Sequence, residues 1–164
     1  MDNRVVGKTE LLRRLRQGKA AMDGALAALS PEMMVTQRQL GDWSVKDLIA
    51  HFTAHEQRAL GELRSALRGG PLPPDPGEDF NRRTVEASRW HALEDVRADW
   101  ERSFREVITA VELLSDADFD PSGGVVYVLG DTIDGALANH SYAHYAEHLD
   151  AVLALVGQPK PEMR

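Results

Sequence analysis

The chain has 164 residues, 43% hydrophobic and 27% charged, a balance typical of one globular domain with a single core, here assigned to residues 1–164. A formal net charge of −7 argues against nucleic-acid binding, which needs clustered Lys and Arg. The absence of cysteine excludes disulfides and thiolate ligands. The sequence contains neither an apolar run long enough to span a bilayer nor the apolar segment of a signal peptide. We therefore expect a cytoplasmic protein without membrane contact.

The first half of the chain predicts two amphipathic helices. Apolar residues recur at three- and four-residue spacing over residues 9–29 and again over residues 44–67. Ser44 precedes the second segment, and Asp47 stands at its third helical position, as in a capping box. Gly69 and the glycine after it mark the end of this helix.

A long connection separates the second helix from the third. Residues 68–91 include the proline-rich stretch PLPPDP and a short segment, residues 79–88, that predicts a helical turn. A third amphipathic helix is predicted over residues 92–114. A connection of this length can carry the chain along the bundle, so that the third helix starts parallel to the second.

The C-terminal part of the chain predicts a fourth helix. The stretch VVYVLG, residues 125–130, favours a short buried extended segment. We expect Asp131 to cap a continuous helix over residues 132–156, before Gly157. The predicted fold is all-α, a four-helix bundle of up-down-down-up topology with its long crossover between helices 2 and 3.

Three histidines occupy apolar positions of the fourth helix. In HSYAHYAEH, His140, His144 and His148 continue the spacing of the core residues before and after them. A buried imidazole without a hydrogen-bond partner costs on the order of 1–3 kcal/mol. A divalent metal would satisfy several imidazoles at once, so the pattern predicts a metal site.

Helix geometry limits which of these histidines share an ion. His140 and His148 lie roughly 12 Å apart along the axis at a rise of about 1.5 Å per residue, too far for one ion. The pair is therefore His140 with His144, or His144 with His148, and a third ligand comes from elsewhere.

The second helix offers the third ligand in LIAHFTAHE, which contains His51, His55 and Glu56. Antiparallel second and fourth helices place His51 at the depth of His148, whereas parallel helices place it near His140. The long connection favours the antiparallel arrangement, which selects His51, His144 and His148. The roles of His55 and His140 stay open, although His140 is expected to pack beside the site, and His91 is expected to be exposed at a helix start.

WSVKDLIAHFTAHE followed by HSYAHYAEH resembles the DinB-like superfamily of metal-binding four-helix bundles, and the middle stretch EDFNRRTVEASRW is similar to its ClbS/DfsB-type branch. The resemblance implies a metal held at His51, His144 and His148. Relatives include thiol-dependent transferases and a mycothiol-dependent maleylpyruvate isomerase. His140 departs from the family's usual Asn.

A three-histidine site leaves the ion an open position and its full charge, which suits activation of a water or a thiol. Without cysteine, an attacking sulfur must come from a low-molecular-weight thiol co-substrate. The predicted function is that of a thiol S-transferase or a hydrolase that acts on a small electrophile. The predicted metal is Zn, Ni or Fe, which imidazole ligands favour. Glu56 and Tyr145 are candidates to move protons or to orient ligands. The alternatives are a protein that sequesters a small molecule, or a bundle with a structural metal. We also expect a homodimer.

Overall fold

The computed structural model describes residues 5–158, and its regular elements over this range are helical, which confirms the predicted all-α class. The ends of the predicted domain, residues 1–4 and 159–164, lie outside the described residues. In chain order the elements are α1 (Lys8–Ala27), α2 (Pro31–Val35), α3 (Val45–Leu67), α4 (Phe80–Ser88), α5 (Leu93–Glu112), η1 (Asp116–Phe119), α6 (Gly124–Leu129), α7 (Ile133–Ala138) and α8 (Tyr142–Leu153).

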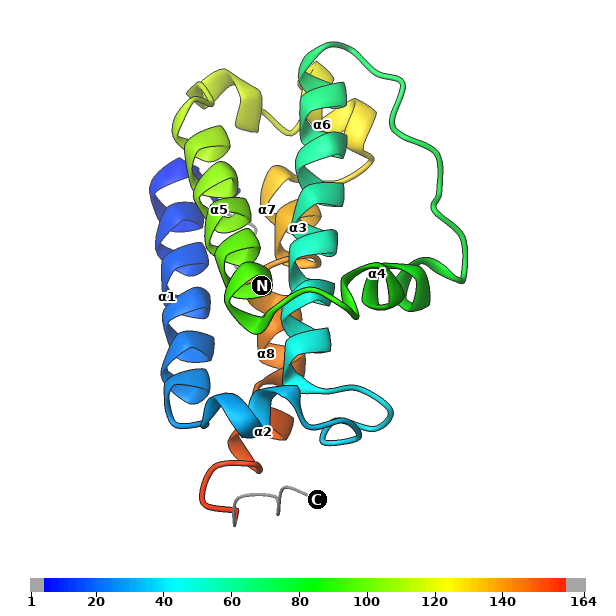
Figure 1. Cartoon of the computed structure of the whole chain (residues 1–164). Helices are drawn as coiled ribbons and strands as arrows, with labels where there is room; N and C mark the ends of the chain where they lie inside the picture. Colours follow the sequence, from blue (N-terminus) through cyan, green and yellow to red (C-terminus); the bar gives the residue numbers. More distant parts are fainter. Residues whose placement is uncertain (1–4, 159–164) are drawn as a thin grey trace.

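The long helices lie side by side (Figure 1). α3 and α5 run in the same direction, while α1 and the α7–α8 segment run in the opposite direction. The chain between α3 and α5 passes along the outside and carries α4. None of the helices within the described range combines the length and the apolar character needed to cross a membrane.

The core consists of two apolar clusters separated by a polar layer. One cluster gathers residues such as Met22, Phe52 and Trp100, and the other gathers residues such as Leu60 and Val107. Between them each long helix contributes polar side chains that are almost fully buried: Lys19 from α1, Glu56 from α3, Ser103 from α5 and His144 from α8. Buried polar groups are stable only with partners, so this layer is where a functional site is expected.

Both ends of α3 have the capping residues that the sequence predicts. The Ser44 hydroxyl accepts from Asp47 N at 3.1 Å and the Asp47 carboxylate accepts from Ser44 N at 2.9 Å, so the predicted capping box is present. At the other end Gly69 and Gly70 adopt φ of +89° and +82°, a region that favours glycine.

The connection between α3 and α5 is fixed to the helices it passes. The predicted helical turn at residues 79–88 is present as α4. Lys46 of α3 donates to the carbonyl oxygens of Arg89 and His91 at 2.8 and 2.9 Å. These bonds hold the C-terminal side of α4 against α3, near the histidines.

The prediction of one continuous helix over residues 132–156 was wrong. Thr132, rather than Asp131, is the N-cap of α7, and the chain leaves helical geometry at Ser141, with φ −138° and ψ −112°, before α8 begins. The Ser141 hydroxyl donates to the Leu137 carbonyl across the break. Side-chain bonding of this kind competes with helical bonding and bends the chain.

The predicted buried extended segment at residues 125–130 was also wrong. These residues fall within α6 and its C-cap, Gly130, whose φ is +68°. No residue of α6 is buried, and Tyr127 is 86% exposed. An apolar run this short does not distinguish strand from helix by its spacing.

Candidate metal centre

Five histidines from two antiparallel segments gather in the polar layer. Rings that neighbour one another lie with centroids 4.4 to 5.7 Å apart. The cluster consists of His51 and His55 on α3, His140 in the turn before α8, and His144 and His148 on α8.

The closest pair at the buried end is His51 and His144. Their Nε2 atoms lie 2.9 Å apart, and the two residues are 3% and 6% exposed. Two nitrogens bound to one ion at about 2.0–2.1 Å lie roughly 2.9–3.4 Å apart, depending on the coordination angle. The pair is therefore spaced for one shared ion.

The electrostatics of this pair suit metal binding. Burial lowers the pKa of His51 and of His144 to about 3, and the neighbouring histidines lower it further. Both rings are thus neutral at pH 7, the form that binds metals. Each Nδ1 is buried without a hydrogen-bond partner among the described residues, a costly arrangement for a polar atom.

His148 lies at the more open edge of the cluster. Its ring centroid is 5.7 Å from that of His51 and 5.1 Å from that of His144. His148 also lines a hollow of about 450 Å³, which gives a small molecule a path to the cluster. Its other lining residues are Gln39, Leu40, Gly41, Trp43, Leu48, Ala151, Ala154, Leu155 and Gln158, none of them charged.

His55, whose role the sequence left open, is a second neighbour of the pair. Nitrogens of His51, His55 and His144 lie within 4.8 Å of one another, close enough to hold a metal ion. The spacing of His51 and His55, four residues apart on one helix, was the signal in the sequence. The structure thus brings together two of the three predicted ligands and places both His55 and His148 beside them.

His55 also contacts His140, the member of the cluster that precedes α8. Their Nδ1 atoms are 2.9 Å apart, and His55 Nε2 lies 2.9 Å from Asn81 Oδ1 of α4. The sixth histidine, His91, is exposed just before α5, as expected, and does not belong to the cluster.

Glu56 and Tyr145 lie behind the histidines rather than among them. Glu56 is 0% exposed, and its Oε1 accepts from the Tyr145 hydroxyl and, at 2.9 Å, from Trp100 Nε1. Burial raises the pKa of Glu56 to about 8, against the opposing influence of Ser103 and Trp100. Tyr145 is 1% exposed within the apolar core.

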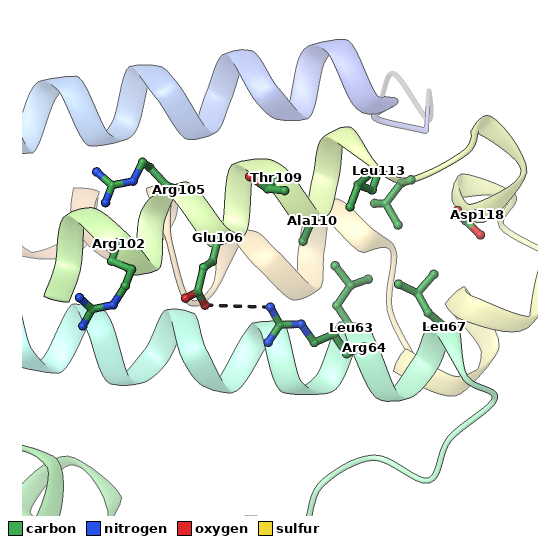
Figure 2. Close-up of a pocket in the computed structure, with 11 residues that line it drawn as sticks. Leu63, Arg64, Leu67, Arg102, Arg105, Glu106, Thr109, Ala110, Leu113 and Asp118 are labelled. Carbon is green, nitrogen blue, oxygen red and sulfur yellow. Dashed lines mark ion pairs between the residues drawn. The ribbon is translucent and has the colours of Figure 1, made fainter.

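A separate groove lies between α3 and α5, away from the histidines (Figure 2). Its volume is about 530 Å³, and Arg64 pairs with Glu106 across it at 4.0 Å. Leu67 and Leu113 at its end are 44% and 81% exposed. The groove holds no histidine, so it is not part of the metal centre.

Fold and site together define an all-helical protein with a partly buried, neutral histidine cluster able to hold a metal ion. The family model of the DinB superfamily matches residues 14–152, and the chain belongs to this superfamily. The match includes all five clustered histidines. No curated protein and no solved structure matches the chain.

Proposed function

We propose that the protein is a metal-dependent enzyme that acts on a small electrophile, either as a thiol S-transferase or as a hydrolase. The observation that carries this proposal is the 2.9 Å approach of two neutral, buried imidazole nitrogens, those of His51 and His144, beside an open hollow. Imidazole ligation favours Zn, Ni or Fe over Mg or Ca.

We propose His148 as the third ligand. It is four residues from His144 on one helix face, and it forms the boundary between the buried pair and the hollow. An ion held there would supply Lewis acidity and would lower the pKa of a coordinated water or thiol. The three protein ligands would leave the position toward the hollow open to that group.

The lining of the hollow indicates the kind of substrate. Trp43 stands 4.9 Å from His51, ring centroid to ring centroid, and Leu40 and Leu155 add apolar surface. An uncharged, mainly apolar electrophile fits this lining. A thiol must come from a small co-substrate because the chain has no cysteine.

We also infer an up-down-down-up four-helix bundle of the ClbS/DfsB-type branch. The directions of α1, α3, α5 and α8 support the topology (Figure 1), and the stretch EDFNRRTVEASRW supports the branch.

We propose a homodimer that pairs through the exposed Leu67 and Leu113 beside the α3–α5 groove. Light scattering should then give twice the 18.2 kDa chain mass; one chain mass at micromolar concentration would contradict pairing.

The experiment is a turnover assay on the full chain reconstituted with Zn²⁺. Glutathione with 1-chloro-2,4-dinitrobenzene tests S-transfer, and p-nitrophenyl acetate tests hydrolysis. We expect turnover above the uncatalysed rate in one assay, lost in His144→Ala and retained in His91→Ala, a matched change outside the cluster. Turnover that is equal in both variants would contradict the proposed site.

The alternative function is sequestration of a small molecule without turnover. The uncharged lining around Trp43 favours it as much as it favours catalysis, because binding needs only the hollow. Saturable quenching of tryptophan fluorescence by an apolar compound, with no product formed, would support sequestration over the enzyme.

A further inference from the structure

We infer that the chain holds a second metal site, distinct from the His51–His144 pair, formed by His55 and His140 with Asn81 as its supporting residue. It would take a divalent transition metal such as Zn²⁺ and complete its coordination with water or a small anion.

The two histidine pairs repeat one contact. From His51 to His55 the chain advances four residues along α3, and from His144 to His140 it goes back four residues on the antiparallel segment. Each step reaches another nitrogen pair 2.9 Å apart. The rings of the two pairs approach to 4.4 Å between the centroids of His51 and His55, but each pair has its own close nitrogen contact, so a ligand of one ion does not need to serve the other.

Asn81 determines which nitrogen of the neutral His55 ring carries the proton. Its carbonyl oxygen accepts from His55 Nε2, so neutral His55 keeps its lone pair on Nδ1, the atom that faces His140. Metal-binding histidines characteristically donate the other ring N–H to a carbonyl or carboxylate in this way. Phe80, also on α4, packs edge-on against His55 at 5.2 Å between centroids.

His55 is therefore oriented for the second pair rather than for the first. One of its nitrogens is engaged by Asn81 and the other by His140, although its ring lies near His51 and His144. His140 completes this pair, since its Nδ1 is the atom that lies 2.9 Å from His55 Nδ1.

The surroundings of the second pair suit an accessible ion. His55 and His140 are half-buried, whereas the first pair is buried. Glu62 acts on His140 and Glu147 acts on His55. Glu62 accepts from Arg58 at 3.0 Å, so the charges of Glu62 and Arg58 largely offset each other. With two protein nitrogens instead of three, the second ion should bind at least ~10-fold more weakly than the first.

The experiment is a calorimetric Zn²⁺ titration of the full, untagged chain after chelation and dialysis. We expect two ions per wild-type chain and one in His140→Asn, which keeps a polar side chain of similar length and should retain the tighter ion. His51→Ala should lose the tighter ion and retain the weaker one. His91→Ala, a histidine outside both pairs, should bind two.

Three results would overturn the inference. One is a single ion in the wild-type chain, which would mean that His55 and His140 only share a hydrogen bond. Another is a weak second ion that persists in His140→Asn. The last is His55→Ala losing the tighter ion while His148→Ala keeps it, since His55 would then be a ligand of the first site. Unchanged far-UV circular dichroism shows that each variant is folded.

Discussion

The Tyr145 hydroxyl donates a hydrogen bond to Glu56 Oε1, although each residue directly follows a histidine of the cluster in sequence. The two side chains point away from the histidines into the core, where Trp100 Nε1 donates to the same oxygen. The contact ties α3, α5 and α8 together behind the site. Glu56 Oε2 has no hydrogen-bond partner among the described residues, and burial raises the pKa of this carboxyl to about 8, so it is protonated near neutral pH.

Glu56→Gln should change how stability depends on pH. The pKa of Glu56 is about 8 in the folded chain and near 4.5 when exposed, so between these values the folded state holds a proton that the unfolded state has lost. That difference lowers the free energy of unfolding by up to ~1.4 kcal/mol per pH unit as pH rises. Gln keeps an acceptor for Tyr145 and Trp100 but cannot ionise. The free energy of unfolding of the variant should therefore increase relative to that of wild type from pH 5 to pH 8.

Urea denaturation at pH 5, 6, 7 and 8 with chelator present measures this gain. Glu78→Gln, an exposed carboxyl in the α3–α5 connection, is the control and should follow wild type. A constant difference between Glu56→Gln and wild type across the range would mean that Glu56 is ionised throughout.

The buried pair His51 and His144 should make stability depend on pH in the opposite direction. His51 and His144 have a folded pKa of about 3 against an ordinary 6.5, so the unfolded chain binds more protons between these values. The metal-free protein should therefore lose stability as pH falls below about 6.5, by up to ~1.4 kcal/mol per pH unit for each excluded proton. In urea denaturation at pH 5 to 7, the free energy of unfolding of His144→Asn should fall less steeply with decreasing pH than that of wild type. If the two free energies fall in parallel, His144 does not exclude a proton in the folded state.

The sequence predicts the long helices because their signals are local. The capping box at Ser44 and Asp47 and the glycine pair after α3 each use residues only a few positions apart, and the structure has both. Matching depth on antiparallel helices predicts His51 beside His148, whereas the structure places it nearer His144, with ring centroids 4.6 Å apart against 5.7 Å to His148.

Two features could not be predicted from the apolar spacing of the sequence. The break at Ser141 interrupts a stretch whose apolar spacing is continuous, so periodicity gives no sign of it. Likewise the carbonyl of Asn81 that orients His55 comes from α4, at the end of a connection whose path the sequence does not define.

Gly18→Ala should destabilise the protein although alanine favours helices. A Cβ at Gly18 of α1 would lie 2.5 Å from Tyr142 Cβ and 2.9 Å from Tyr142 Cα, at the start of α8. Relieving this overlap must move α8 or α1, at a cost of about 1–3 kcal/mol. Gly24→Ala is the matched control: it lies on the same helix with no atom within 4 Å, and should stabilise by roughly 0.5–1 kcal/mol. Thermal denaturation of both variants checks the sign, and equal shifts would mean that α1 and α8 are not in close contact.

His144→Ala should remove most of the affinity for the tighter ion. His144 contacts His51 through Nε2 and shares a helix face with His148, so its loss leaves two ligands on different helices. Even a supporting residue outside the ligand set is worth about 10–100-fold in affinity, and a ligand should cost more. His148→Ala should also weaken this ion, because it removes the proposed third ligand. Zn²⁺ titration in competition with a chelator of known affinity measures both losses. His91→Ala should match wild type, and an unchanged affinity in His144→Ala would show that the ion is held elsewhere.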